Sequence, residues 1–378
     1  MSRPRLCYVV SSEITVKAFL LEHIRAAVAG YDVSVVANTP DTSALRALGV
    51  PVDITPVAIE RRIAPLADLA ALWALYRYFR RERFDLVHSV TPKAGLLAAL
   101  AGALAGVRVR LHTFTGQVWA TRAGFGRWLL KRIDAFTGAA CTHVLADSGS
   151  QREFLVMEGV VAADGIEVLA QGSVNGVDAG RFKPDAAARA RIRVEWGVAP
   201  DAVVFLYLGR LTVDKGLLDL ARAFADVPGA VLAMVGPDEE GLTERIRAAC
   251  AGAAGRLRFV GYTGEPQAYM AAADVFVLPS YREGFGSTVI EAAACGLPAI
   301  ASRIYGLTDA VVDGATGFLV PPRDPAALAQ RMRELAADAS LRLRLGAAAR
   351  ERALRDFSQV TLTRATLAYY ELNLARSR

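Results

Sequence analysis

Short apolar runs alternate with longer helical stretches along the chain, and this alternation restricts the fold more than any other feature. In the first half, strands are expected at residues 6–10, 33–37, 85–89, 107–112 and 143–146. Helices are expected between them, at residues 16–29, 42–48, 67–81, 94–105, 126–140 and 148–158. Such strand–helix–strand units, joined by right-handed crossovers, build a parallel sheet covered by helices. The first half is therefore expected to be a Rossmann-like α/β domain.

The same alternation returns in the second half. Strands are expected at residues 203–209, 230–235, 257–260, 275–279 and 298–302, with helices that begin at Gly216, Glu239, Pro266, Thr288 and Asp324. A turn-rich stretch at residues 171–184 separates the halves, and a last amphipathic helix is expected at residues 357–374. We expect one domain at residues 1–172, a second at 173–356, and a C-terminal helix at 357–378 that crosses back to the first domain.

Charge and cysteine usage exclude several classes of protein. The formal net charge of +6, without a long basic run, suits an anionic ligand or an anionic membrane surface better than nucleic acid. The four cysteines have no CxxC spacing, which favours a reducing compartment over a disulfide framework. The longest uncharged apolar run, residues 94–107, is shorter than the roughly 18 residues of a membrane-spanning helix. The apolar run that ends at Val10 is too short for a signal peptide, so we expect a cytoplasmic protein.

The segment from Glu283 to Glu291 is the best candidate for a site. It follows an expected strand and leads into an expected helix, so it lies at the strand edge where α/β sheets bind ligands. Gly284 and Gly286 allow close approach of a ligand, and a helix N-terminus favours an anion. The alternative is structural, because the four residues that end at Glu291 fit a capping box that begins at Thr288.

A second loop, Gly209 to Gly216, carries two cations between an expected strand and helix. Arg210 can donate two hydrogen bonds to phosphate oxygens, and Lys215 adds a mobile charge. An ordinary solvated loop is the alternative, but that alternative does not explain the flanking glycines or the acidic segment expected at the same edge. Together the two loops predict a diphosphate site.

These motifs carry a family resemblance. Arg210, Lys215, Glu283 and Glu291, with the stretches 175–178 and 182–184, resemble retaining glycosyltransferases of family four, which have the GT-B fold of two Rossmann-like domains facing each other across a cleft. The resemblance covers essentially the whole chain. Residues 91–95 and 112–121 resemble the branch that builds bacterial capsule, O-antigen and glycoprotein glycans on a polyprenyl diphosphate lipid.

The resemblance implies a role for each motif residue. Arg210 and Lys215 would hold the donor diphosphate, Glu291 the ribose, and Tyr262 the base, while Glu283 would lie beside the transferred sugar. The loop and helix N-terminus at Gly286, Ser287, Thr288 and Val289 would complete the phosphate cradle. His112 would contact the sugar or the reacting centre.

On the acceptor side, the candidates are Lys93, Ser11, Glu13, Thr115 and Gly116. Lys93 follows Thr91-Pro92 at an expected helix start, where a solvated lysine is the equal alternative. Ser11-Ser12-Glu13 stands where many relatives have a Gly-Gly loop, and where a dinucleotide-binding domain would have GxGxxG. We expect no bound dinucleotide there. His88 and His143 lie in apolar strands and are expected to be core histidines.

The chemistry implied is transfer from a nucleotide sugar without a metal or other cofactor. The chain contains no Asp-x-Asp, the device by which metal-dependent transferases bind a diphosphate. Fixed cations and a helix N-terminus would stabilise the leaving diphosphate. Retention would use either a carboxylate nucleophile or same-face attack, and the sequence does not choose between them. A UDP-linked N-acetylated hexosamine and a polyprenyl-diphosphate-linked glycan are the expected substrates.

Two basic and aromatic clusters suggest an anionic membrane surface as a further partner, on the inner face of the cytoplasmic membrane. A core aromatic stripe beside a charged face is the alternative for each cluster. Their members are Trp73, Tyr76, Arg77, Tyr78, Phe79, Arg80, Arg81 and Arg83, and Arg122, Phe125, Arg127, Trp128, Lys131 and Arg132.

Two other functions remain open at this stage. A glycoside hydrolase with Glu283 and Glu291 as its acid and nucleophile would have no use for Arg210 and Lys215. A non-catalytic basic protein that binds membrane or nucleic acid would not need Glu291.

Overall fold

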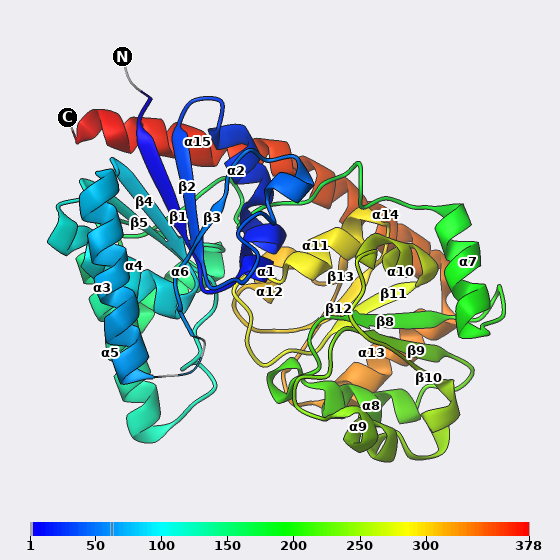
Figure 1. Ribbon diagram of the computed structural model, residues 1–378. Helices are drawn as coiled ribbons and strands as arrows, with labels where there is room; N and C mark the ends of the chain where they lie inside the picture. Colours follow the sequence, from blue (N-terminus) through cyan, green and yellow to red (C-terminus); the bar gives the residue numbers. More distant parts are fainter. Residues whose placement is uncertain (1–2, 61, 63, 378) are drawn as a thin grey trace. The chain divides into compact units, whose positions relative to one another are not determined.

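Two separate parallel sheets organise the chain (Figure 1). The computed structural model describes residues 3–60, 62 and 64–377. One compact unit contains the chain up to Asn175 together with the segment from Gln359 onward, and the other unit is Gly176–Ser358. Each unit has the parallel α/β architecture that the alternation of strands and helices predicts.

The first unit contains a seven-stranded sheet in the order β3-β2-β1-β4-β5-β6-β7. Its strands are β1 (Arg5–Val9), β2 (Asp32–Ala37), β3 (Ile54–Pro56), β4 (Leu86–Val90), β5 (Val109–Phe114), β6 (His143–Ala146) and β7 (Glu167–Val168). The short strands β3 and β7 extend the two edges beyond the strands expected from the sequence. The order reverses between β1 and β4, which makes their carboxyl ends the expected ligand edge.

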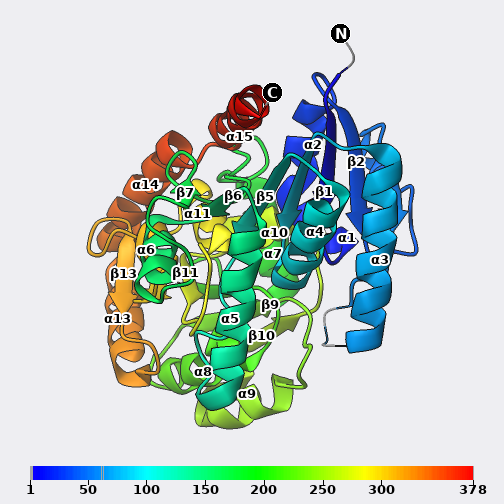
Figure 2. The ribbon, with the colours of Figure 1, turned by 90° about the vertical axis from the view of Figure 1, so that its left-hand side faces the viewer.

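Alternate residues of the strands face two separate helical layers. Leu6 and Tyr8 pack in one core, and Cys7 and Val9 pack in the other. The helical segments of this unit are α1 (Glu13–Thr15), η1 (a π-helix, Val16–Leu20), α2 (Leu21–Ala27), η2 (Arg46–Leu48), α3 (Pro65–Glu82), α4 (Pro92–Ala105), α5 (Gly124–Ala140), α6 (Gly149–Met157) and α15 (Gln359–Arg376). On one face of the sheet, α4 lies between α3 and α5 (Figure 2).

The helix expected at residues 42–48 is wrong. This stretch is a turn that ends in the single 3-10 turn η2. The Asp41 carboxylate accepts hydrogen bonds from both the backbone N–H and the hydroxyl of Ser43, and Gly49 closes the segment at φ 75°. In a stretch this short, few intrahelical hydrogen bonds can form to offset the free-energy cost of helix nucleation. Side chains that hydrogen-bond the backbone then favour a turn.

The C-terminal helix α15 belongs to the core of the first unit. Tyr370 is fully buried, and its hydroxyl lies 2.6 Å from Nδ1 of His88. Nε2 of His88 lies 2.8 Å from the Thr113 hydroxyl, and burial lowers the pKa of His88 to about 3. His88 is therefore the hydrogen-bonded core histidine expected from its strand. The same expectation is wrong for His143, which is partly exposed at the start of β6, with its Nδ1 2.8 Å from the Thr142 hydroxyl.

The second unit contains a six-stranded parallel sheet in the order β10-β9-β8-β11-β12-β13. Its strands are β8 (Val204–Leu208), β9 (Val231–Val235), β10 (Leu257–Val260), β11 (Val275–Leu278), β12 (Ala299–Ser302) and β13 (Gly317–Val320). Its helical segments are α7 (Ala186–Trp196), η3 (Val213–Lys215), α8 (Leu217–Ala225), α9 (Thr243–Ala249), η4 (Ala251–Arg256), α10 (Pro266–Ala272), α11 (Ser287–Ala294), α12 (Leu307–Ala310), α13 (Pro325–Ala337) and α14 (Ala339–Asp356). The helix expected from Glu239 begins at Thr243. The helices α7, α12 and α14 and the strand β13 were not expected from the sequence.

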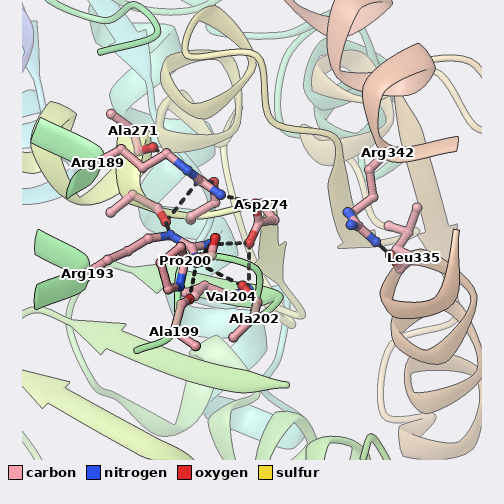
Figure 3. Close-up of polar contacts among 12 residues, drawn as sticks. Arg189, Arg193, Ala199, Pro200, Ala202, Val204, Ala271, Asp274, Leu335 and Arg342 are labelled. Atoms are coloured by element: carbon pink, nitrogen blue, oxygen red, sulfur yellow. Dashed lines mark hydrogen bonds and ion pairs between the residues drawn. The ribbon is translucent and has the colours of Figure 1, made fainter. Parts of the chain in front are cut away.

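A partly buried ion-pair cluster fixes α7 at the amino end of the central strands (Figure 3). Asp274 precedes β11 and accepts hydrogen bonds from Arg189 and Arg193, each at 2.7 Å. Its second oxygen also accepts from the backbone N–H of Val204, at the start of β8. The polar anchor thus ties β8, β11 and α7 together at the amino edge, away from their carboxyl ends.

Candidate active site

The two loops singled out in the sequence lie at the reversal point of the second sheet. Gly209 to Gly216 follows β8, and residues 279–286 follow β11, which is hydrogen-bonded to β8. Because both strands are parallel, their carboxyl ends lie at one edge, where α/β sheets bind ligands. The expectation that both loops open on one edge is confirmed.

Polar contacts join the two loops directly. Lys215 forms an ion pair with Glu283, and the two side chains are only 19% and 14% exposed. Asp214 accepts a hydrogen bond from Arg282 at 3.2 Å, and its carbonyl oxygen accepts one from the backbone N–H of Tyr281 at 2.8 Å. The cation of one motif and the carboxylate of the other therefore form one partly buried cluster.

Gly216 is required where the loops meet. Its φ is 68°, and a Cβ at this position would lie 2.1 Å from the carbonyl oxygen of Pro279. A side chain would therefore be strained by the backbone angle and would collide with backbone that cannot rotate away. The glycine that flanks Lys215 sets the distance between the two loops.

A third loop takes part that the sequence analysis did not identify. Arg210 donates to Glu239 at 2.9 Å, and Glu240 accepts a hydrogen bond from the backbone N–H of Val213 at 2.9 Å. Both carboxylates follow β9, the neighbour of β8 in the sheet. The signal was present as Asp238-Glu239-Glu240 after an apolar strand, but its partners lie about 30 residues earlier in the chain. Arg210 is half-exposed, so a ligand can reach it.

Helix α11 begins at Ser287 with Gly286 as its N-cap, at φ 84°. No side-chain cap hydrogen bond forms, so the structural alternative, a capping box from Thr288 to Glu291, is wrong. The backbone N–H of Val289 donates to the carbonyl of Gly286 at 2.8 Å and is already satisfied. The N–H groups of Ser287 and Thr288, in contrast, precede the first intrahelical bond, as at any helix N-terminus. These two groups are the ones suited to bind an anion.

Glu291 lies in the second turn of α11 and is partly buried. Burial raises the pKa of Glu291 to about 7, while the positive charge of Arg181 lowers it. A carboxylate whose pKa is raised by burial, and which does not cap its helix, is typical of a functional site.

Tyr262 follows β10, at the edge of the same sheet, and is 79% exposed. An exposed ring at the ligand edge is available for stacking. The residues expected to bind the donor nucleotide in the second half of the chain thus lie in the loops after β8, β10 and β11 or in the first two turns of α11.

His112 lies on β5 of the first unit and is almost fully buried. Its Nδ1 lies 3.1 Å from the carbonyl oxygen of Ser89 and 3.0 Å from the Ser89 hydroxyl. Burial lowers the pKa of His112 to about 4, so the ring is neutral near pH 7. With its proton on Nδ1 donated to the carbonyl, Nε2 is left as an acceptor. The ring packs on α4, where a Cβ at Gly95 would lie 2.3 Å from it.

The acceptor-side candidates follow β1, β4 and β5 of the same sheet, but two of them are already paired. Lys93, in the first turn of α4, donates to Asp68 at 2.7 Å. Glu13 accepts from Lys17 and from Thr39, and these hydrogen bonds lower its pKa. Ser11 precedes the N-cap of α1, and Thr115 and Gly116 directly follow β5, Gly116 at φ 92°.

Thr91 shows backbone strain at the point where β4 leads into α4. Its φ is 84°, which is an outlier for a β-branched residue, and its buried hydroxyl oxygen has no hydrogen-bond partner among the described residues. Such strain is concentrated at functional sites. The sequence motif at residues 91–95 gave no sign of this conformation.

Comparisons with known proteins identify the family. Residues 188–352 match the family of glycosyl transferases group 1, and residues 20–172 match the glycosyl transferase 4-like domain. EpsD of Bacillus subtilis (strain 168), which bears a glycosyltransferase name, is 30% identical over 75% of this chain and 76% of its own length. The chain therefore belongs to the group 1 glycosyltransferases, and it is a glycosyltransferase.

Two further relatives have more specific names. The capsular polysaccharide biosynthesis glycosyltransferase CapM of Staphylococcus aureus is 29% identical over 80% of each chain. The UDP-Gal:alpha-D-GlcNAc-diphosphoundecaprenol alpha-1,3-galactosyltransferase of Escherichia coli is 29% identical over 70% of this chain and 69% of its own length.

A solved structure confirms the fold. Anabaena Alr3699/HepE, crystallised with UDP and glucose, superposes with a TM-score of 0.81 at 20% identity, over 98% of this chain and 100% of its own. The expected fold of two Rossmann-like domains of the GT-B type is thus confirmed. Within the described ranges, no helix combines the length and the apolar character that crossing a bilayer requires.

Proposed function

We propose that this enzyme transfers a sugar from a UDP-sugar to a polyprenyl-diphosphate-linked glycan with retention of configuration. The observation that carries the proposal is the cluster of Lys215, Glu283 and Arg210 beside the N-terminus of α11, at the reversal point of the second sheet. This arrangement places cations, free backbone donors and one carboxylate around a single edge, which is what a nucleotide diphosphate sugar needs.

In the proposed complex, Arg210 and Lys215 bind the diphosphate together with the N–H groups of Ser287 and Thr288. Glu291 accepts hydrogen bonds from the ribose hydroxyls, and Tyr262 stacks on the base. The HepE structure was solved with UDP, and the E. coli relative is named for a UDP-linked donor, which supports UDP here. Gly286 supplies the positive φ from which α11 begins, and a Cβ there would collide with Leu307.

The proposed chemistry uses these charges where they are needed. When the sugar–phosphate bond breaks, negative charge develops on the diphosphate and positive charge on the anomeric carbon. Arg210, Lys215 and the dipole of α11 stabilise the leaving group without a metal. Glu283 stabilises the positive charge or binds a sugar hydroxyl, and Nε2 of His112 accepts a hydrogen bond from the sugar.

For the donor sugar we propose an N-acetylated hexosamine, and for the acceptor a glycan on a polyprenyl diphosphate. The resemblance of residues 91–95 and 112–121 to the capsule and O-antigen branch supports both proposals. The E. coli relative is named for a diphosphoundecaprenol acceptor, but for galactose as the donor. UDP-galactose is therefore the comparison donor.

A purified-protein binding assay tests the donor proposal. A thermal-shift panel would compare UDP-N-acetylglucosamine, UDP-N-acetylgalactosamine, UDP-galactose and UDP-glucose with their GDP counterparts. A donor present at about 100 times its Kd should stabilise the folded protein by roughly 2.7 kcal/mol. A shift from GDP-sugars alone would refute the UDP proposal.

Substitution of the diphosphate residues tests the site itself. Lys215→Met should weaken UDP binding about 10- to 100-fold, because it removes a charge-assisted contact to phosphate. Arg189→Met, at the amino edge of the sheet, is the control for loss of one cation. Isothermal calorimetry with UDP gives both values, and equal affinities in the two variants would contradict the site.

We further propose that the first unit docks on the cytoplasmic face of an anionic membrane. Two outward stripes carry exposed apolar residues, each with helical spacing: Leu66, Leu69 and Trp73 on α3, and Phe125, Trp128, Leu129 and Phe136 on α5. Arg77, Arg80 and Arg81 on α3 and Arg132 on α5 are also exposed. Apolar side chains flanked by arginine suit the headgroup layer of an anionic bilayer.

Some residues of the two basic and aromatic clusters are in the protein core or in ion pairs, and so are not available to a membrane. Phe79 is buried in the core, and Tyr78 packs on Phe84, so these two rings belong to the protein interior. Arg127 and Lys131 pair with Glu158 at 2.6 and 2.7 Å. The docking surface is therefore narrower than the sequence clusters.

Co-sedimentation with liposomes tests the docking proposal. The triple variant Phe125→Ser, Trp128→Ser and Phe136→Ser should lose binding to vesicles that contain anionic lipid. A control with Val194→Ser and Leu343→Ser, which are 81% and 75% exposed in the second unit, should keep it. Binding that ignores lipid charge would refute the proposal.

A further inference from the structure

Ser280 lies two residues beyond the end of β11 and is completely buried. Its hydroxyl donates to Oε1 of Glu283 at 2.7 Å, within the same loop. In the sequence, Ser280 directly follows the strand expected at residues 275–279. In the structure it is in direct contact with the carboxylate assigned to the transferred sugar.

Oε1 of Glu283 accepts from two donors of different kinds. One is the ammonium group of Lys215, which we assign to the donor diphosphate, and the other is the Ser280 hydroxyl. A bound diphosphate brings negative charge that competes with Glu283 for Lys215. Ser280 is neutral and closed off from solvent, so its hydrogen bond to Glu283 does not face the same competition.

We propose that Ser280 is a positioning residue that holds Glu283 in place when Lys215 turns to the diphosphate. Its hydroxyl fixes Oε1, which leaves Oε2 to face the sugar. Ser280 itself need not touch the donor. This inference rests on the proposed function, because it assumes that a nucleotide diphosphate occupies the loops after β8 and β11.

The rigid surroundings of Ser280 support this role. Pro279 precedes it, and the carbonyl of Pro279 is in contact with Gly216 of the neighbouring loop. The backbone at Ser280 is therefore fixed by the same contact that sets the separation of the two loops. A hydroxyl on fixed backbone can orient a carboxylate three residues away at little entropic cost.

Ser302 provides a matched control. It ends β12, the neighbour of β11 in the sheet, and is only 1% exposed. Ser302 therefore resembles Ser280 in its burial and in its place near the end of a strand. The difference is that Glu283 accepts its hydrogen bond from Ser280. A loss of packing or of strand-end stability should affect both serines alike.

The experiment compares wild type with Ser280→Ala, Ser280→Cys and Ser302→Ala. The Kd for UDP is measured by calorimetry, and UDP release from the best UDP-sugar of the thermal-shift panel gives kcat and KM. Ser280→Ala should lower kcat about 10- to 100-fold, the worth of one hydrogen bond to a charged group. Its Kd for UDP should stay within about twofold, because its own contact is to Glu283 and not to the nucleotide.

The remaining variants decide between positioning and packing. Ser280→Cys keeps a weak donor in nearly the same volume, so its kcat should fall between those of wild type and Ser280→Ala. Ser302→Ala should keep a wild-type kcat. An equal loss of kcat in Ser280→Ala and Ser302→Ala, or a Kd for UDP that rises in parallel, would overturn the proposal.

The outcome also separates this inference from the proposed function. A wild-type protein that binds no UDP would refute the donor assignment and the role of Ser280 with it. Normal binding of UDP, together with a wild-type kcat in Ser280→Ala, would refute the role of Ser280 alone.

Discussion

At the scale of single residues, both cations assigned to the diphosphate are held by carboxylates in the structure. Arg210 is paired with Glu239 and Lys215 with Glu283. Each pair is at least partly shielded, and a bound diphosphate has to compete with these carboxylates for the two cations. The pairs keep the cations ordered before the donor arrives, which reduces the entropy lost on binding.

Glu291 provides a prediction about pH. Because burial raises its pKa to about 7, the carboxylate that should accept hydrogen bonds from the ribose is largely protonated below that pH. UDP affinity should therefore fall as the pH decreases through about 7, by up to tenfold per pH unit. Calorimetry from pH 5.5 to 8.5 measures this, with Glu291→Gln as the variant that should bind weakly and lose the dependence.

The same pKa shift affects protein stability in the direction opposite to its effect on UDP affinity. The folded protein binds the Glu291 proton more tightly than the unfolded chain does, so the contribution of Glu291 to stability decreases as the pH rises from 4.5 to about 7. Glu291→Gln should be more stable, relative to wild type, at pH 8 than at pH 5. An unchanged difference in urea midpoints between these two pH values would contradict the assignment.

At the scale of elements, the loops after β8 and β11 act as one unit because their backbones touch. Gly216→Ala should separate them, since its Cβ would collide with the carbonyl of Pro279. We expect a loss of at least about 2 kcal/mol in unfolding free energy, from the strained φ together with the collision. UDP affinity should fall as well.

Gly314→Ala is the control for this prediction. Gly314 has a similar φ of 75°, but a Cβ there would meet open space. Its substitution should cost only the backbone strain, about 1 kcal/mol, and leave UDP binding unchanged. Urea unfolding and calorimetry compare the two variants, and equal effects would show that the contact with Pro279 is unimportant.

At the scale of the whole molecule, the chain leaves the first unit and returns to it through α15. Tyr370 fills the core of that unit beside His88, Tyr8 and Tyr31. Tyr370→Ala should therefore lower the stability of the first unit by about 3–5 kcal/mol, as for other large core side chains. UDP should instead stabilise the second unit, where its proposed contacts lie.

Differential scanning calorimetry can separate these two effects. Tyr370→Ala should move the unfolding transition of the first unit, and UDP should move that of the second. Tyr262→Ala, at an exposed position of the second unit, is the control that should leave the first transition unchanged. A single transition that moves equally in all cases would show that the two units unfold together.

Much of the fold could be read from the sequence because its signals are local. Buried strands such as β8 and β11 are continuous apolar runs, and the helices between them have a 3.6-residue period. Several failures lie where local signals are weak, but the 18-residue helix α14 and the strand β13 were missed as well. The stretch at 42–48 is too short to specify a helix, β3 and β7 have only three and two residues, and α7 was missed despite its Asp185 N-cap.

The sequence by itself determined where the candidate site lies: Arg210 and Lys215 follow one apolar strand, and Glu283 and Glu291 follow another. Only the tertiary structure decided which groups meet. Lys215 pairs with Glu283, and Arg210 with Glu239, across long stretches of chain. The hydrogen bond of Ser280 to Glu283 and the burial of His112 depend on packing that no local pattern records. The periodicity of a segment shows which of its residues are buried. It does not show which side chains meet at the sheet edge, because that depends on the order of the strands.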